Sequence, residues 1–118
     1  MIPYFGIPLA TSNLSAKLIQ KTKAKTLFLY AMRNDDHGFD MHIEPIDDRI
    51  YQGNPNQGTA VILAAIEDLI RRYPEHYHWS YKRFKANPAL DHLYHLNTDE
   101  ALKLVEDVRR QDAQTKII

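Results

Sequence analysis

Near the middle of the chain lies the stretch Pro74-Glu75-His76-Tyr77-His78-Trp79-Ser80-Tyr81-Lys82-Arg83-Phe84-Lys85, around which the rest of the sequence is organised. It holds the only tryptophan, three aromatic rings within five residues and three cations within its last four residues. Aromatic rings interleaved with Lys and Arg suit a surface that contacts both apolar chains and anionic head groups. The alternative is that the cations are solvated while the rings pack as core: Tyr77, Trp79, Tyr81 and Phe84.

Length and composition limit the possible classes of protein. A chain of 118 residues forms one domain at most, and its 44% hydrophobic content is ordinary for a globular protein. Lys plus Arg balance Asp plus Glu at 15 each, so no overall field attracts a polyanion and no nucleic-acid partner is expected. The absence of Cys excludes disulfides and thiol chemistry. The longest apolar runs, 27–32 and 60–66, are far shorter than the roughly 20 residues that cross a bilayer.

The first half of the chain predicts a helix followed by a hairpin. Residues 1–11 combine two prolines and a glycine with apolar residues, which favours an extended or looped segment. The spacing of apolar residues predicts a helix over 13–23. The continuous apolar run 26–32 fits a strand buried on both faces, and the alternating run 39–44 fits a strand with one wet face. The polar turn 34–38 joins them as a loop of about five residues.

The second half predicts two further helices. Residues 46–58 are polar and contain two glycines and a proline, so they are expected to form a loop. An apolar stripe predicts a helix over 59–73, which the following proline ends. A last helix is expected to start at Asn97 or Thr98, with residues 111–116 frayed.

Two motifs resemble one protein family. The pattern Pro-Glu-x-Tyr-x-Trp-x-x-(Lys/Arg)-Arg-Phe-Lys at 74–85 resembles the carboxyl-terminal signature of the bacterial lipid A biosynthesis acyltransferases, the lauroyl and myristoyl transferases. The segment Pro3-Tyr4-Phe5-Gly6-Ile7-Pro8-Leu9-Ala10-Thr11 resembles the Phe-Phe-Gly-x-Pro-Ala-x-Thr segment of that family. The resemblance covers about residues 2–88 in the family's order, and the pair of motifs is more specific than either alone.

The resemblance also has departures from the family pattern. Lys23 stands where the family usually has Gly, Phe28 where it has Pro, and Tyr81 where it has His. These differences bear on the substrate that the resemblance implies and not on the family.

The resemblance implies a fold and an activity. The fold would be α/β, the carboxyl-terminal part of a glycerolphosphate-acyltransferase-like mixed sheet with flanking helices, ordered helix, strand, strand, helix and tail helix. Residues 1–88 would belong to the acyltransferase domain and residues 89–118 would form a helical tail. Members of the family move an acyl group from an acyl carrier protein thioester to a hydroxyl of a lipid A precursor, at the cytoplasmic face of the inner membrane. The resemblance implies no cofactor.

Acyl transfer to a hydroxyl requires a base for the proton and donors for the developing oxyanion. The resembled family supplies the base as a His-x-x-x-x-Asp/Glu pair that lies well before the Phe-Phe-Gly-like segment, as does its membrane helix. We therefore expect this chain to be the carboxyl-terminal part of such an enzyme, to lack the catalytic pair and to need the amino-terminal half as a partner. Two spacings imitate the pair, His42 with Asp47 and His95 with Glu100, but about 0.8 such matches are expected by chance.

The remaining histidine spacings do not predict a metal site. His76-x-His78 and His92-x-x-His95 each offer two nitrogen ligands, whereas a closed site needs about four converging ligands with outer support. Surface or interface histidines are the expected alternative.

Four cations are candidates for an anion or substrate site. Arg83 occupies the signature position, and its guanidinium suits a phosphate or a carboxylate; Lys82, Lys85 and Arg33 are lesser candidates. The anion could be the phosphorylated glucosamine head group, the acidic acyl carrier protein or an anionic lipid of the membrane surface. Alternatively, Arg83 forms a salt bridge or cap that fixes the tail, and Arg33 is an ordinary charge at a strand end.

Two other roles remain open at this stage. The chain could be a non-catalytic peripheral membrane or protein-binding module that uses the 79–85 surface, or a decayed remnant. In the acyltransferase reading, strand 27–32 needs neighbours on both sides, so the isolated chain is expected to expose apolar surface and to be marginally stable or self-associating.

Overall fold

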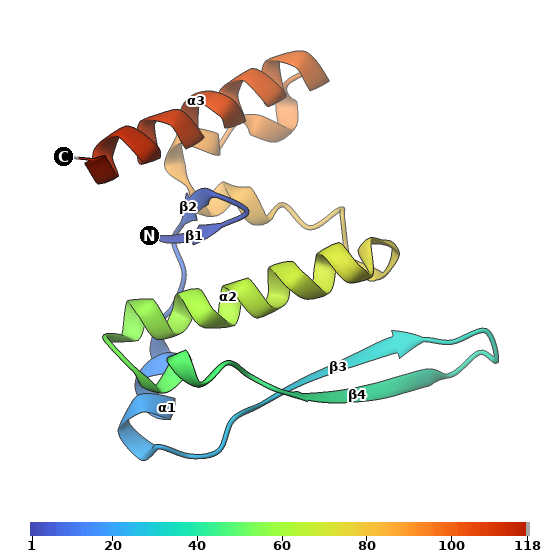
Figure 1. Cartoon of the computed structure of the whole chain (residues 1–118). Coiled ribbons are helices and arrows are strands. Elements are labelled where there is room, and N and C mark those ends of the chain that lie inside the picture. Colours follow the sequence, from blue (N-terminus) through green and yellow to red (C-terminus); the bar gives the residue numbers. More distant parts are fainter. Residues whose placement is uncertain (118) are drawn as a thin grey trace. The chain divides into compact units, whose positions relative to one another are not determined.

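The structure, a computed structural model, describes the backbone of residues 1–117 and the side chains of residues 1–116. Two compact units are formed, one from residues 1–11 with 78–118 and the other from residues 12–77. Figure 1 traces the elements along the chain. The predicted division into a domain of residues 1–88 and a tail of residues 89–118 stays a prediction.

The first unit begins with a short β-hairpin. Strands β1 (Ile2–Tyr4) and β2 (Ile7–Leu9) pair antiparallel, with Ile2 opposite Leu9 and Tyr4 opposite Ile7. The two turn residues, Phe5 and Gly6, have φ angles of 49° and 74°. Positive φ at both central residues is the geometry of the tight turns that match the twist of a hairpin. The predicted extended segment is therefore confirmed, and its pairing is a feature that the sequence did not indicate.

One face of this hairpin forms the core of the first unit. Its four facing apolar side chains are almost fully buried, together with two residues from later in the chain, Leu90 and Val108. Leu90 ends the 3-10 helix Pro88–Leu90, and Val108 lies in helix α3 (Thr98–Ile117). The predicted start of the last helix is confirmed. The predicted fraying of residues 111–116 is wrong, because α3 continues through them with a hydrogen bond from Thr115 Oγ1 to the Gln111 carbonyl.

The second unit contains helix α1 (Leu14–Thr22), a long β-hairpin and helix α2 (Pro55–Arg72). Strands β3 (Leu27–Arg33) and β4 (Phe39–Pro45) pair antiparallel. Their loop is closed by the Asn34 N–H donating to the Gly38 carbonyl. The predicted first helix, both strands and the five-residue loop are confirmed, as is the α/β class.

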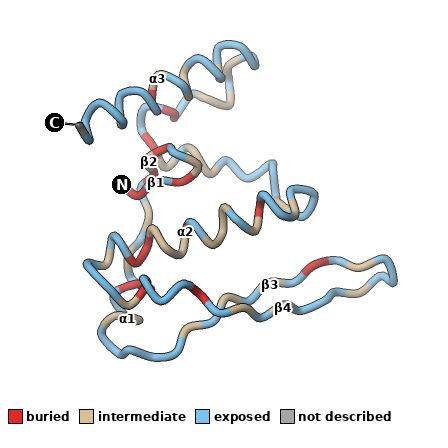
Figure 2. The backbone as a smooth tube through the Cα atoms, in the orientation of Figure 1, coloured by how far each residue is buried: buried red, intermediate tan, exposed pale blue. Residues whose placement is uncertain are grey.

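The burial predicted for the first strand of the hairpin is wrong. Within this chain β3 has α2 on one side only, so Leu27 and Leu29 remain half exposed. Figure 2 shows most of the hairpin as exposed or intermediate, with Met32 buried near its tip. The expected exposure of apolar surface is confirmed.

Helix α2 begins four residues earlier than the apolar stripe predicted. Pro55 occupies its first turn, and the Asn54 side chain accepts from the Gln57 N–H while Gln57 Oε1 accepts from the Asn54 N–H. This reciprocal capping box satisfies donors that a helix start otherwise leaves open. The predicted loop 46–58 is correspondingly shorter, and it includes the 3-10 helix Asp48–Tyr51.

Gly58 allows α2 to pack closely on α1. A Cβ at this position would lie 3.1 Å from Ala16 Cβ and 3.2 Å from the Ile50 carbonyl oxygen. It would also lie 2.9 Å from Gln20 Nε2, which donates to the carbonyls of Ile50, Gln52 and Asn54. The glycine therefore preserves a side-chain amide that organises the start of α2.

We predict that Gly58→Ala destabilises the chain by about 1–3 kcal/mol, because the methyl group overpacks this contact. An unconstrained helix position would instead gain about 0.5–1 kcal/mol. Urea unfolding followed by circular dichroism measures the change. In a Gln20→Ala background the loss is expected to shrink, and a gain from Gly58→Ala alone would contradict this packing.

A polar network joins the hairpin to α2. Tyr30 OH donates to Glu44 Oε1 at 2.6 Å, and Arg72 reaches the two Glu44 oxygens at 3.2 and 3.3 Å. Arg72 also pairs with Asp68 at 2.9 Å. The hydrogen bonds from Arg72 and then from Tyr30 lower the pKa of Glu44, while the bond to Glu44 raises the pKa of Tyr30.

The Glu44 interaction predicts a pH dependence of stability. Because the folded pKa of Glu44 lies below its ordinary value of 4.5, its contribution is complete above that value and is lost as the pH falls through the lowered pKa. Glu44→Gln is expected to flatten the acid limb of stability between about pH 5 and pH 3. Thermal unfolding measured against pH checks this, with Glu106→Gln on α3 as the control. An unchanged acid limb in Glu44→Gln would contradict the network.

Candidate functional site

The two sequence motifs meet in the first unit. The Ala10 N–H donates to the Ala86 carbonyl at 3.1 Å, and Asn87 Nδ2 donates to the Pro8 carbonyl at 2.8 Å. These bonds join the end of the β1–β2 hairpin to the 3-10 helix Arg83–Ala86 and its cap. We call residues 1–11 with 83–87 the motif junction. It brings together segments that are more than 70 residues apart in the sequence.

Arg83 lies at the centre of the motif junction and is half-buried. Its Nη2 donates to Thr11 Oγ1 at 3.2 Å, and its Cζ lies 5.5 Å from the centre of the Tyr4 ring. Tyr4 in turn contacts the ring of Phe84, with 6.0 Å between centroids. A guanidinium has five N–H donors, and within residues 1–117 Arg83 forms no salt bridge. The side chain is therefore held in place with donor capacity left for an anion.

The structure places the other predicted cations differently. Lys82 and Lys85 flank Arg83 and are exposed, and Lys82 Nζ lies 5.7 Å from the centre of the Tyr94 ring. Arg33 ends β3 in the second unit, where its Cζ lies 5.9 Å from the Phe39 ring centre. Three of the four cations therefore share one short segment, and their binding of an anion stays a prediction.

The aromatic rings of this stretch have different surroundings. Phe84 is half-buried against Tyr4, whereas Trp79 is 66% exposed and Tyr81 is 63% exposed. The alternative in which all these rings pack as core is therefore wrong for Trp79 and Tyr81 in this chain. Exposed rings next to Lys82 and Arg83 match the composition of a surface that contacts apolar and anionic groups together.

Sequence reasoning missed two side chains of this unit. Asn87 is only 5% exposed, and besides its bond to Pro8 its Oδ1 accepts from the Ala89 N–H at 2.9 Å. Arg109, from α3, donates to the Phe5 carbonyl at 2.8 Å in the hairpin turn. The Asn-Pro dipeptide at 87–88 signals a turn but not its distant partner.

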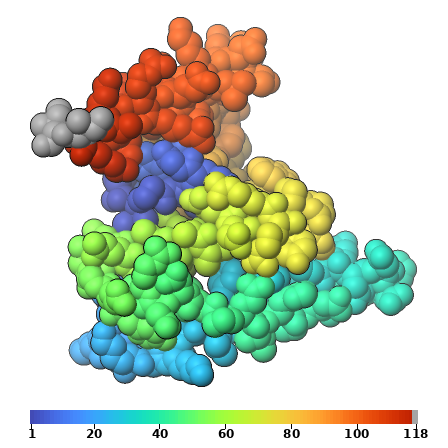
Figure 3. Space-filling model, viewed as in Figure 1, coloured from blue at the N-terminus to red at the C-terminus, as the bar shows by residue number. Residues whose placement is uncertain are grey.

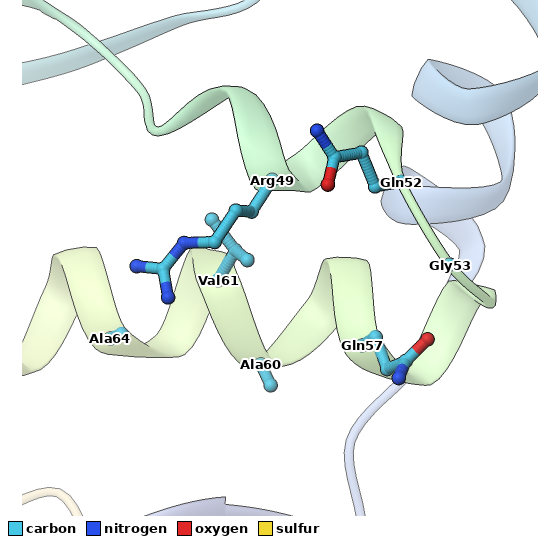
Figure 4. Close-up of a pocket in the computed structure, with 7 residues that line it drawn as sticks. All are labelled: Arg49, Gln52, Gly53, Gln57, Ala60, Val61 and Ala64. Atoms are coloured by element: carbon cyan, nitrogen blue, oxygen red, sulfur yellow. The ribbon is translucent and has the colours of Figure 1, made fainter.

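The second unit contains a shallow depression along the first half of α2, with a volume of about 540 Å³. Figure 4 shows Arg49 extending from the 3-10 helix Asp48–Tyr51 alongside α2, near Val61 and Ala64. Arg49 also binds Asp47 through Nε and Nη2, which lowers the pKa of Asp47 to about 2. This arginine is thus already neutralised by a neighbouring carboxylate.

Neither of the His-to-acid spacings forms a pair within residues 1–117. His42 stacks on Tyr30, with 4.9 Å between ring centroids and 4° between planes, while Asp47 is bound by Arg49. Glu100 lies in the first turn of α3, and its backbone N–H donates to Asn97 Oδ1. In the part of the chain that the structure describes, no three His, Asp or Glu side chains converge as metal ligands. No helix there is both long and apolar enough to cross a membrane.

We predict that Asn87→Asp destabilises the first unit by about 1–3 kcal/mol, because a carboxylate cannot donate to the Pro8 carbonyl and repels it. Asn56→Asp is the matched control, since Asn56 is exposed and uses its side-chain oxygen as an acceptor. That variant should change stability by less than about 0.5 kcal/mol. Urea unfolding of both variants makes the comparison, and equal effects would contradict the role assigned to Asn87.

Comparisons with known proteins agree with the two motifs. Residues 1–86 match the family Bacterial lipid A biosynthesis acyltransferase. The chain is 33% identical over 89 residues to the Lipid A biosynthesis palmitoleoyltransferase of Escherichia coli (strain K12) and to the Lipid A biosynthesis acyltransferase of Shigella flexneri. Each match covers 74% of this chain and 29% of the relative, so the chain spans about three-tenths of the length of these relatives. The chain belongs to the bacterial lipid A biosynthesis acyltransferase family.

Proposed function

We propose that this chain acts as the carboxyl-terminal part of a lipid A biosynthesis acyltransferase. The complete enzyme would move an acyl group from an acyl carrier protein thioester to a hydroxyl of a lipid A precursor. The observation that carries the proposal is the motif junction, in which the first family motif is bound by Arg83 of the second motif and by Ala86 and Asn87, which directly follow it. The family match over residues 1–86 supports it.

In this proposal the base that takes the hydroxyl proton comes from the part of the enzyme outside this chain. Acyl transfer requires a base with a free acceptor nitrogen or oxygen close to the hydroxyl. Among the described side chains His42 forms no ion pair with Asp47, which binds Arg49, and His95 forms none with Glu100, whose backbone N–H donates to Asn97 Oδ1. The match covers only 29% of the relative, so such a pair can lie in the part of the enzyme outside this chain. For the same reason we propose that this chain forms part of a larger glycerolphosphate-acyltransferase-like mixed sheet.

Arg83 would contribute by binding an anion. Its fixed guanidinium, with donors left after the bond to Thr11, suits a phosphate of the acceptor or a carboxylate of the carrier protein. Lys82 and Lys85 would add positive charge nearby, and Arg33 is a weaker candidate because it lies in the other unit. Exposed Trp79 and Tyr81 would contact the cytoplasmic face of the inner membrane.

A second candidate function rests on the exposure of these two rings. A non-catalytic module could use residues 79–85 to bind a membrane or a protein without transferring an acyl group. This candidate and a decayed remnant both predict that the chain adds no acyl group to lipid A in any context.

The proposal can be tested with a chimera in which this chain replaces the matched segment of the Escherichia coli palmitoleoyltransferase. The chimera and the chain alone are expressed in a strain that lacks that enzyme, and lipid A is analysed by mass spectrometry. We expect an added acyl chain with the chimera and none with the chain alone. A folded chimera without acyl transfer would favour the module or the remnant, and acylation by the chain alone would overturn the external base.

Variants of Arg83 test its role within the same chimera. Loss of a charge-assisted hydrogen bond costs about 1.5–3 kcal/mol, so Arg83→Gln should lower kcat/KM roughly 10- to 100-fold. Arg83→Lys keeps the charge and should recover part of the loss. Arg110→Gln, which removes an exposed guanidinium from α3, is the control. If Arg83→Gln lowers the melting temperature but leaves kcat/KM unchanged, Arg83 only positions the motif junction.

A further inference from the structure

One face of the β3–β4 hairpin is apolar and uncovered. The pairing places four cross-strand pairs on it, which are Leu27 with Pro45, Leu29 with Ile43, Ala31 with Met41 and Arg33 with Phe39. All eight residues are exposed, and the five large apolar side chains range from 49% to 68% exposed. We call this surface the open face. An uncovered apolar face of this kind marks an interaction site.

The opposite face already has a partner. Phe28, Tyr30 and Met32 alternate with the residues of the open face, and they lie in hollows shared with α2. The helix side chains that line these hollows with them include Ala65, Leu69 and Ile70. The space-filling view shows the hairpin tip, in cyan, projecting beyond the rest of the second unit (Figure 3). The hairpin is therefore one layer short of a packed sheet.

Both edges of the hairpin offer backbone groups. The bond from the Asn34 N–H to the Gly38 carbonyl sets the alternation of the ladder, so the even-numbered residues of β3 bond to β4. The outward N–H groups on β3 then belong to Leu27, Leu29, Ala31 and Arg33. Those on β4 belong to Phe39, Met41 and Ile43, since Pro45 has no N–H.

These open edges argue against lipid as the occupant of the open face. Hydrocarbon cannot satisfy outward N–H and C=O groups, so a two-stranded ribbon is costly to bury in a bilayer. The loop at the tip carries Asp35 and Asp36, and anionic lipid repels such charges. A polypeptide can satisfy the edge groups and cover the apolar side chains at once.

The composition of the two strands indicates that a third strand pairs with β3 and not with β4. Strand β3 is apolar on both faces from Leu27 to Met32, which is typical of a strand inside a sheet. Strand β4 alternates Asp40, His42 and Glu44 with apolar residues and ends at Pro45, which is typical of an edge. A third strand is therefore expected next to β3.

We propose that the open face and the outward edge of β3 form the docking surface for the part of the parent acyltransferase domain that lies outside this chain. That part supplies a strand along Leu27–Arg33 and apolar side chains over Leu29 and Ile43. The inference rests on the proposed function, and the occupant follows from the length of the relatives, of which this chain covers 29%. The hairpin would then lie at an internal interface of one enzyme, with β4 as an edge strand of its sheet.

Hydrogen exchange by NMR tests the proposal on the isolated 118-residue chain and on the chimera with the Escherichia coli palmitoleoyltransferase. In the chimera, the amides of Leu29 and Ala31 should be protected roughly 100-fold more than in the monomeric isolated chain. The amides of Met41 and Ile43 should exchange equally fast in both. Protection on β4 alone, or on neither strand of a folded chimera, would overturn the proposal.

A matched pair of substitutions gives an independent measurement. Leu29→Lys places a charge on the open face, while Leu18→Lys is the same change at an α1 residue with the same 55% exposure. Leu29→Lys should make the chimera roughly tenfold or more sensitive to proteolysis, and Leu18→Lys should not. Equal sensitivity would contradict the docking surface.

Other outcomes are distinguishable from failure of the proposed function. Protection of Leu29 and Ala31 in a chimera that transfers no acyl group would support docking while the acyltransferase role fails. Protection in a dimer of the isolated chain but not in the chimera would assign the open face to a second copy and overturn the proposal. If the chimera does not fold, protection of these amides in the monomeric isolated chain would still refute an open edge.

Discussion

The structure depends on the contact between the start of the chain and the segment that follows its tryptophan. Asn87 is buried and satisfies the Pro8 carbonyl, while the Ala10 and Ala86 backbones share a hydrogen bond. A buried polar group must keep its partner, because leaving it unpaired costs about 1–3 kcal/mol. The motif junction is thus a constraint on both segments, and it fixes Arg83 between Thr11 and Tyr4.

The second unit is held together by the contacts of helix α2. Helix α2 is organised by the Asn54 cap, by the Gln20 amide and by Gly58, and it holds one face of the β3–β4 hairpin through Tyr30, Glu44 and Arg72. The other face of that hairpin remains apolar and exposed. Under the proposed function, the cation-bearing junction in one unit would bind an anion, and the uncovered hairpin face in the other would complete a sheet.

Local chemistry made the β3–β4 hairpin predictable, because Asn, Asp and Gly at 34–38 separate a continuous apolar run from an alternating one. It also predicted α1 and the start of α3. The start of α2 was misjudged because Pro55 and Gly58 suggest a loop, although Asn54 and Gln57 together carry the capping signal. The partners of Arg83 and Asn87 could not be predicted, because those contacts join residues 72 and 79 positions apart. Positive φ at Phe5 has no sequence signal, since bulky residues rarely adopt it.

The most direct test of the motif junction is a scalar coupling across the hydrogen bond between the Ala10 amide nitrogen and the Ala86 carbonyl carbon, measured by NMR on the labelled chain. The account predicts a resolved coupling together with slow exchange of the Ala10 N–H. An Ala10 amide that shows no coupling and exchanges at the rate of an unstructured peptide would mean that the two family motifs do not hold each other, and the account would be wrong.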